Sequence, residues 1–383
     1  MKISLFNTYK IVVPIDEYLM EYFQENNIQA EFIVLNKAYR KTQTLGNYNY
    51  RLIKLPRIIQ KNKLLSQIYY GFRVVIDLIF NKSDLFILFT QPPFFFIVFS
   101  FILRLRKKKY FLYVMDVYPD LLFATFSNFP FKNIINRLSS HSYKNASKVI
   151  VLGECMKKRI VSRGINIENI ILLPNSSHLL VSQKSDTRLI KEKHPELKDK
   201  FILLYSGNMG VPHIFTTIKK VAKQFRNKHD KILFVFVGSG KRLDEIKEVI
   251  HYNNVILLDS LDDVLFHQIT ELADCHLITL SPEYTGISVP SKFYSSLAAG
   301  KPVLFEGSNE CELAKQISHY QIGKVIEPYN INQLSVAILE YYWNPDKKEI
   351  HGKKALELYN HNFSKEALKN LYTNTLGKII HEK

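Results

Sequence analysis

Short apolar runs alternate with amphipathic stretches along most of the chain. In the first half, runs at 3–6, 31–35, 85–89, 110–115, 148–152 and 170–173 predict strands, and helices are expected around 16–26, 94–105, 134–144 and 154–163. The second half repeats the pattern, with strands at 201–205, 232–237, 255–258, 276–279 and 302–305 and helices at 214–225, 242–251, from 262 and near 292–299. Strands that are apolar throughout and alternate with helices are typical of parallel sheets with helices on both faces.

A polar, lysine-rich segment at 176–200 interrupts this alternation and is predicted to be a linker. The length of 383 residues also suits two domains. We therefore predict an α/β protein with two doubly wound, Rossmann-like domains facing across a cleft, residues 1–178 and 179–363. A helix at about 364–383 is expected to pack back on the first domain. In such sheets, ligands bind beyond the carboxyl ends of the strands.

Charge is distributed unevenly between the two halves. The net charge is +17, and residues 1–180 hold 25 basic and 11 acidic side chains, against 27 and 24 in residues 181–383. The first half is therefore expected to face an anionic partner. The three cysteines (Cys155, Cys275 and Cys311) are too few for a disulfide framework or a zinc site and are interpreted as small apolar residues. No secretory signal is visible, so a cytoplasmic location is expected.

The most apolar stretch, residues 85–103, carries no charge and leads into the basic run 104–109. Prolines near its middle favour a strand, a turn and a helix over a membrane span. The helix at 94–105 is apolar all round, which leaves two interpretations. It is buried between neighbours, or it lies in the headgroup region of a membrane while the basic run binds anionic lipid. The candidate membrane or acceptor contacts are Phe95, Phe99, Arg104, Arg106, Lys107 and Lys108.

Three segments of the second half carry candidate chemistry. Residues 205–210 (YSGNMG) and 235–241 (VFVGSGK) place glycines where a strand turns into a helix, a position that suits phosphate but is also used by tight turns without a ligand. In the third, residues 285–303, Ser291 is predicted to cap a helix and Gly300 to end it. Lys292 then lies in the first turn, which is unfavourable for a cation unless an anion is bound. The alternative is a solvated lysine.

In this order and spacing, these segments resemble glycosyltransferase family 4, and most closely the branch that builds capsular, O-antigen and colanic-acid-type polysaccharides. First-half positions that match are Gln91-Pro92-Pro93, residues 116–119, 151–154 and 173–175. The resemblance implies the GT-B fold and a retaining hexosyl- or N-acetylhexosaminyltransferase. Its donor would be a nucleoside-diphosphate sugar bound to the second domain, without a cofactor or a metal.

The resemblance also implies roles for individual residues. Lys292 would neutralise the charge of the departing diphosphate. Asp116 would orient a sugar hydroxyl or accept the acceptor's proton, although a turn cap explains it equally well. His213 would be a polar contact after the first glycine turn, or a surface histidine at a helix start. The residues expected to bind the donor are Gly207, Asn208, Met209, Gly210, His213, Gly238, Ser288, Val289, Ser291 and Ser295.

The chain departs from the family pattern at several of these positions. Ile287 and Ser295 stand where many members carry a pair of glutamates, and Asn208 stands where many carry arginine. The segment after the first strand, residues 7–17, has no glycine, so the family's glycine-rich loop at this place is missing. These departures leave Lys292 as the clearest cation for the diphosphate.

The expected function is transfer of a sugar to a saccharide linked to polyprenyl diphosphate, by an enzyme peripherally associated with the inner face of the cell membrane. A sugar-nucleotide 2-epimerase on the same fold is the alternative enzyme. The charge alone is also compatible with nucleic-acid binding, but no recognised module for it is visible, so no nucleic-acid partner is expected.

Overall fold

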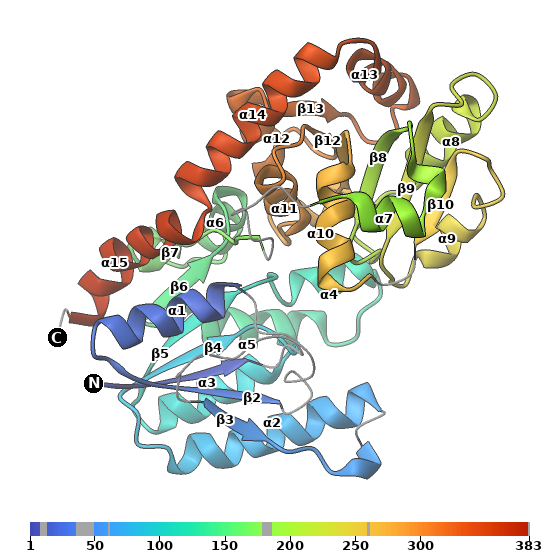
Figure 1. The fold of residues 1–383 in the computed structure, drawn as a ribbon. Helices are drawn as coiled ribbons and strands as arrows, with labels where there is room; N and C mark the ends of the chain where they lie inside the picture. The colour runs from blue at the N-terminus through green and yellow to red at the C-terminus, as the bar shows by residue number, and fades with distance from the viewer. Residues whose placement is uncertain (8–13, 36–49, 60–61, 178–185, 259–260, 382–383) are drawn as a thin grey trace. The chain divides into compact units, whose positions relative to one another are not determined.

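The computed structural model describes residues 1–7, 14–35, 50–59, 62–177, 186–258 and 261–381, and the chain forms two compact units. Unit 1 comprises residues 1–175, 286–289 and 368–383, and unit 2 comprises residues 176–285 and 290–367. Figure 1 shows the course of the chain through both units.

Unit 1 is built on a seven-stranded parallel sheet with the strand order β3-β2-β1-β4-β5-β6-β7. Its strands are β1 (Lys2–Asn7), β2 (Gln29–Leu35), β3 (Tyr50–Ile53), β4 (Leu85–Phe89), β5 (Lys109–Val114), β6 (Lys148–Val151) and β7 (Ile170–Leu172). Its helices are α1 (Pro14–Glu25), α2 (Lys63–Phe80), α3 (Phe95–Leu105), α4 (Asp120–Thr125), α5 (Lys132–Lys144) and α6 (Glu154–Val161), with short 3-10 turns at Arg57–Ile59 and Ile167–Asn169.

Unit 2 is built on a six-stranded parallel sheet with the order β10-β9-β8-β11-β12-β13. Its strands are β8 (Phe201–Ser206), β9 (Ile232–Val237), β10 (Val255–Leu258), β11 (Cys275–Thr279), β12 (Val303–Glu306) and β13 (Gly323–Ile326). Its helices are α7 (Arg188–Lys193), α8 (Thr216–Phe225), α9 (Leu243–Lys247), α10 (Asp263–Leu272), α11 (Lys292–Ala298), α12 (Glu312–Tyr320), α13 (Ile331–Trp343) and α14 (Pro345–Asn362). The last helix, α15 (Lys365–His381), begins in unit 2, and its residues from Leu368 belong to unit 1.

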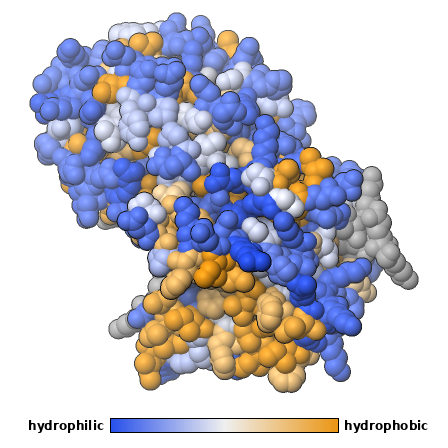
Figure 2. Space-filling model, turned by 180° about the vertical axis from the view of Figure 1, so that it is seen from behind, coloured by the Kyte–Doolittle hydropathy of each residue, from blue (hydrophilic) through white to orange (hydrophobic). Residues whose placement is uncertain are grey.

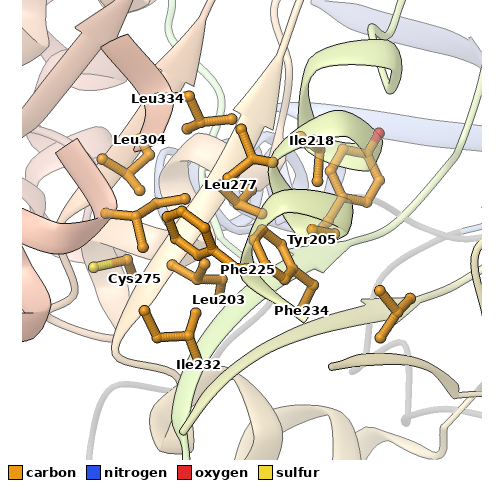
Figure 3. Packing of buried hydrophobic residues seen from close by; sticks show 14 of the residues in the cluster. Leu203, Tyr205, Ile218, Phe225, Ile232, Phe234, Cys275, Leu277, Leu304 and Leu334 are labelled. Atoms are coloured by element: carbon orange, nitrogen blue, oxygen red, sulfur yellow. The ribbon is translucent and has the colours of Figure 1, made fainter. Parts of the chain in front are cut away.

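The core of unit 2 has two layers because successive strand residues point to opposite faces of the sheet. Leu203 and Tyr205 of β8 pack with residues of α8, α9 and α13 on one face (Figure 3), whereas Ile202 and Leu204 pack with α7 and α10 on the other. Both layers are buried, which explains why β8 and β9 are apolar at nearly every position.

The strand order places a topological switch point in unit 2. The neighbours β8 and β11 lie at the centre of the sheet, and the chain continues from them toward opposite edges. A crevice at the carboxyl ends of such a strand pair is where doubly wound sheets bind ligands. The glycine-containing segment 205–210, called the first glycine turn, follows β8, and the segment 235–241, called the second glycine turn, follows β9. A ligand site is therefore expected at this end of the sheet.

The predicted fold class, two α/β units with parallel sheets, is confirmed. Two expectations within it are wrong. The segment predicted to be a linker contains α7 and the 3-10 turn Pro195–Leu197, whose Ile190 and Leu197 are buried in the core of unit 2. The first sheet also has an edge strand, β3, where the sequence pattern predicted no strand.

Helix α3 matches neither interpretation fully, because it has one buried and one exposed face. Phe99 is buried, and the ring of Phe95 packs so closely over Gly71 of α2 that a Cβ there would lie 1.9 Å from it. The expectation that Phe99 contacts lipid is therefore wrong, Phe95 is half-buried, and the exposed apolar residues of α3 are Val98, Phe101 and Leu105.

The basic run after α3 is used partly within the protein. Arg106 donates hydrogen bonds to the carbonyl oxygens of Leu78 and Asn81 (2.8 Å to the latter) at the end of α2, and Arg104 contacts His141 of α5. Lys107 is exposed and Lys108 half-buried. No helix in the described ranges is both long and apolar enough to cross a membrane.

Candidate functional site

The two glycine turns of unit 2 pack directly on each other. The N–H groups of Gly207 and Met209 donate to the carbonyl oxygens of Val237 (2.9 Å) and Ser239 (2.8 Å). Within the described part of the chain, the N–H groups of Asn208 and Gly210 make no hydrogen bond. The expected phosphate contact through the whole turn is thus reduced to these two donors.

The glycines of the second turn are required by this packing. Gly238 has a φ of 127°, and a Cβ on it would lie 2.2 Å from the carbonyl oxygen of Gly207. A Cβ on Gly240 would lie 2.4 Å from the carbonyl oxygen of Met209. Gly238 therefore has a structural role that needs no ligand. The Met209 side chain is fully buried in the core, whereas Asn208 is exposed.

Lys292 places its ammonium group against an aromatic ring at this end of the sheet. Its Nζ lies 3.6 Å from the centre of the Tyr205 ring, is buried, and has no hydrogen-bond partner among the described residues. Burial holds the pKa of this amine well below its ordinary value. The interpretation of Lys292 as a solvated lysine is wrong. A cation–π contact offsets only part of the cost of burying the charge, so this position favours the neutral amine unless an anion pairs with it.

The lysine and the first glycine turn are neighbours. A Cβ on Gly207, whose φ is 103°, would lie 3.9 Å from Cε of Lys292. The aromatic ring beneath the lysine comes from Tyr205, the residue two positions before this glycine, whose hydroxyl donates to the carbonyl oxygen of Asn208 (3.1 Å). Lys292 and the turn thus present positive groups at the carboxyl end of β8.

His213 joins the two sides of the switch point. Its Nδ1 lies 2.6 Å from the carbonyl oxygen of Thr279 at the end of β11, and the Thr279 hydroxyl accepts from the N–H of Ile214 (3.0 Å). Because a carbonyl only accepts, Nδ1 carries the proton and Nε2 is left as an acceptor. Burial, and then the charge of Lys292, lower the pKa of His213 to about 3. The residue is buried, so its interpretation as a surface histidine is wrong.

The remaining residues of the third motif lie around α11. Ser291 occupies the N-cap position as predicted, but its side chain makes no capping hydrogen bond. Val289 is buried. The hydroxyl groups of Ser177 and Ser295 form a hydrogen bond of 3.2 Å. Gly300, with a φ of 64°, follows the last residues of the helix as predicted.

Asp116 lies in unit 1 just after β5, and its carboxylate is held from two sides. Gln91 Nε2 donates to one oxygen (2.6 Å), and the Ser288 hydroxyl donates to the other. Asp116 and Ser288 also form an isolated antiparallel bridge, in which the N–H of Val117 donates to the carbonyl oxygen of Ile287 (2.9 Å). Burial raises the pKa of the Asp116 carboxyl, and the hydrogen bonds from Ser288 and Gln91 oppose this increase.

Two contacts at these sites were not predicted, that of Asp116 with Ser288 and that of Lys292 with the Tyr205 ring. Helix α4 has Pro119 at its N-cap without a side-chain hydrogen bond, so Asp116 is not the cap that its position before Tyr118 and Pro119 suggested. Its partner Ser288 lies 172 positions away in the chain. The ring of Tyr205 is part of the first motif, but only its position in space identifies it as the partner of Lys292.

Comparisons with known proteins agree with this geometry. Residues 186–357, which span most of unit 2, match the family model "Glycosyl transferases group 1". This part of the chain is therefore similar to a glycosyltransferase domain. The chain is 26% identical over 290 residues to the probable glycosyltransferase WbjE of Pseudomonas aeruginosa, covering 70% of each chain. It is 23% identical over 201 residues to the putative colanic acid biosynthesis glycosyl transferase WcaI of Escherichia coli K12, covering 51% of this chain and 49% of that protein.

A solved structure extends the similarity to the whole fold. Anabaena HepE, crystallised in complex with UDP-glucose, superposes with a TM-score of 0.73 at 13% identity, covering 99% of this chain and 100% of HepE. The fold is therefore that of the GT-B glycosyltransferases, and the segment that matches the family model contains both glycine turns and Lys292.

Proposed function

We propose that the protein is a retaining glycosyltransferase of the family 4 type, which moves a hexosyl or N-acetylhexosaminyl group from a nucleoside-diphosphate sugar to a lipid-linked saccharide in surface polysaccharide biosynthesis. The family model and the relatives WbjE and WcaI support the reaction class and its context. The observation that carries the proposal is the buried ammonium group of Lys292 beside the first glycine turn, which has no hydrogen-bond partner among the described residues.

A pyrophosphate is expected to bind between Lys292 and the first glycine turn of unit 2. One phosphate oxygen would pair with Lys292, and others would accept from the N–H groups of Asn208 and Gly210, which have no partner within the described ranges. As the sugar leaves, negative charge grows on the diphosphate, and a cation held in a poorly solvated position stabilises that charge more strongly than water does. Transfer in this scheme requires no metal ion, so activity is expected to persist in EDTA.

Other residues of the candidate set keep proposed roles around this cation. His213, neutral at physiological pH, offers Nε2 as an acceptor for a sugar or nucleotide hydroxyl. Ser291, Ser295 and Val289 remain candidates for contacts with the nucleotide. Ser288 would act through Asp116, whose raised pKa suits a residue that orients a hydroxyl or accepts a proton.

The acceptor is proposed to carry a polyprenyl diphosphate and to be used at the inner face of the cell membrane. The supporting observation is the excess of basic side chains in residues 1–180, which hold 25 basic and 11 acidic residues. An anionic lipid substrate in an anionic membrane would be attracted to this half of the chain.

A ligand panel followed by a product assay tests the proposal. A true donor among UDP-, GDP- and dTDP-sugars should raise the melting temperature, because a ligand that binds the folded state stabilises it by mass action. UDP-glucose is the first candidate, since HepE was crystallised with it. With the donor identified, label should appear in a polyprenyl-diphosphate saccharide. Interconversion of free sugar nucleotides without transfer would instead indicate an epimerase.

A further inference from the structure

Three helices of unit 1 carry a second apolar stripe in addition to the one that packs on the sheet. In α2, buried Tyr70, Val74 and Leu78 repeat every four residues, and a separate outward stripe repeats at a similar spacing. Helix α3 contacts both α2 and α5, so the outward stripes of the three helices are neighbours. We call their exposed residues the apolar face: Leu64, Ile68, Phe72 and Ile79 of α2, Val98, Phe101 and Leu105 of α3, and Phe131, Ile134 and Leu138 at and within α5.

The apolar face is far more exposed than isolated surface residues require. Phe72, Phe101 and Leu105 are 62%, 59% and 69% exposed. Figure 2 shows a broad hydrophobic area, in orange, over the part of the surface that unit 1 forms, while the rest of the view is mainly hydrophilic. Contiguous exposed apolar area of this kind marks an interaction surface.

The charges around the apolar face are almost all positive. Exposed basic side chains flank its apolar residues on each helix: Arg73 and Lys82 beside α2, Arg104 and Lys107 beside α3, and Lys132 and Arg137 on α5. Helices α3 and α5 contain no acidic residue, and Asp77, the single acid of α2, is paired with Arg51. Apart from the contacts of Arg104 with His141 and of Lys132 with the Phe123 ring, these cations have no charged or aromatic partner among the described residues.

We infer that the apolar face, with its basic rim, docks on an anionic phospholipid bilayer. The apolar side chains enter the headgroup and acyl boundary, and the basic side chains pair with lipid phosphates. A second copy of the chain does not fit, because pairing this face with itself would bring like charges together. The inference rests on the proposed function only for its location at the membrane, and it moves the lipid contact from Phe95 and Phe99 to the exposed residues of all three helices.

Vesicle binding of the full chain tests the inference directly. Co-sedimentation with vesicles of phosphatidylglycerol and phosphatidylcholine in equal parts should be strong, should weaken with added salt, and should be much weaker with phosphatidylcholine alone. Phe101→Ser with Leu105→Ser should reduce binding at least tenfold. Both side chains are mostly exposed, so the fold should be retained. A matched double variant in unit 2, Val336→Ser with Trp343→Ser, removes two exposed apolar residues and should bind as wild type.

Variants of the basic rim measure the contribution of charge to vesicle binding separately from that of the apolar residues. Arg73→Gln with Arg137→Gln should lower affinity for the anionic vesicles by about fivefold per charge and flatten the salt dependence. Lys223→Gln with Lys228→Gln, exposed in unit 2, is the control. Wild-type vesicle binding by the Phe101 and Leu105 variant would overturn the inference, as would a lipid-free dimer that this variant dissociates. Donor-induced thermal shifts should be unchanged in all these variants, so a failure here is distinguishable from a failure of the proposed reaction.

Discussion

At the scale of single residues, the central feature is the buried Lys292 ammonium group, which has no hydrogen-bond partner in the described part of the chain. Lys292 holds its Nζ over the Tyr205 ring instead of in water, which is an expensive arrangement for an ammonium group. A solvated surface would give the same charge at no such cost. The position therefore makes chemical sense as one half of an ion pair whose other half arrives with the substrate.

The lowered pKa of Lys292 predicts that donor binding is linked to a proton. Burial favours the neutral amine in the free protein, and a bound diphosphate favours the charged form, so binding raises the pKa again. Donor affinity should therefore fall as pH rises through the free protein's lysine pKa, beginning below the value of about 10.4 typical of an exposed lysine. Calorimetry in buffers of different ionisation enthalpy should detect the proton uptake. Affinity that stays constant up to about pH 10 would contradict this account.

At the scale of elements, the two glycine turns act as one piece. The second turn supports the first through backbone contacts so close that no side chain fits at Gly238. This packing fixes which N–H groups of the first turn are used internally and which remain available. The geometry of the candidate phosphate site thus depends on a residue that need not touch the ligand.

Gly238→Ala should strongly destabilise unit 2. Alanine at a φ of 127° is strained, and its Cβ would lie 2.2 Å from a backbone oxygen that cannot move freely. We expect a loss of about 3 kcal/mol or more in the free energy of unfolding, measured with urea. Gly164→Ala is the matched control. Its φ is 79°, but the nearest atom, 3.1 Å away, ends the flexible side chain of Lys144, so about 1–2 kcal/mol is expected. Equal losses would show that the contact with Gly207 is unimportant.

The elements that could be predicted are those whose sequence pattern follows from burial. Strand β9 is buried at every position and is correspondingly apolar, so its bounds were predicted correctly. Strand β3 lies at the edge of its sheet, and the short helix α7 buries Ile190 among mostly polar residues, so neither has a pronounced apolar pattern and both were missed. The site residues likewise divide into those that a local sequence pattern indicates and those that only the fold brings together. The position of Lys292 at a helix start indicated an anion, whereas the pairing of Asp116 with Ser288 depends on the fold and leaves no local pattern.

At the scale of the whole molecule, the two halves differ in surface and in chemistry. Unit 1 carries the apolar face and its basic rim, and unit 2 carries the segment similar to glycosyltransferases, with the lysine and both glycine turns. This division fits the proposed reaction, in which one substrate is a soluble sugar nucleotide and the other belongs to a membrane.

Two buried histidines of unit 2 predict how stability depends on pH. Burial lowers the pKa of His213 to about 3 and that of His276 to about 4, against about 6.5 in the unfolded chain. Below pH 6.5 the unfolded state binds protons that the folded state does not, so stability should fall by about 1.4 kcal/mol per pH unit for each histidine. The raised pKa values of Asp116 and Glu306 act in the opposite direction, so the histidine contribution is read as a difference between variants.

Urea unfolding at about pH 5 and 7 measures this difference. His276→Gln should reduce the loss of unfolding free energy on acidification by the part that protonation of one histidine contributes. His251→Gln, at an exposed position, should leave this loss unchanged. An identical pH dependence in wild type and His276→Gln would refute the assignment.

The most direct measurement is donor binding by calorimetry to wild type and to Lys292→Met, using the sugar nucleotide that gives the largest thermal shift. Methionine preserves the packing on Tyr205 but has no charge. The variant should therefore be at least as stable as wild type while binding the donor about 100-fold more weakly, a loss of about 3 kcal/mol that is typical of a charged hydrogen bond. Lys228→Met, at an exposed site, should bind normally. Wild-type donor affinity in the folded Lys292→Met protein would contradict the account.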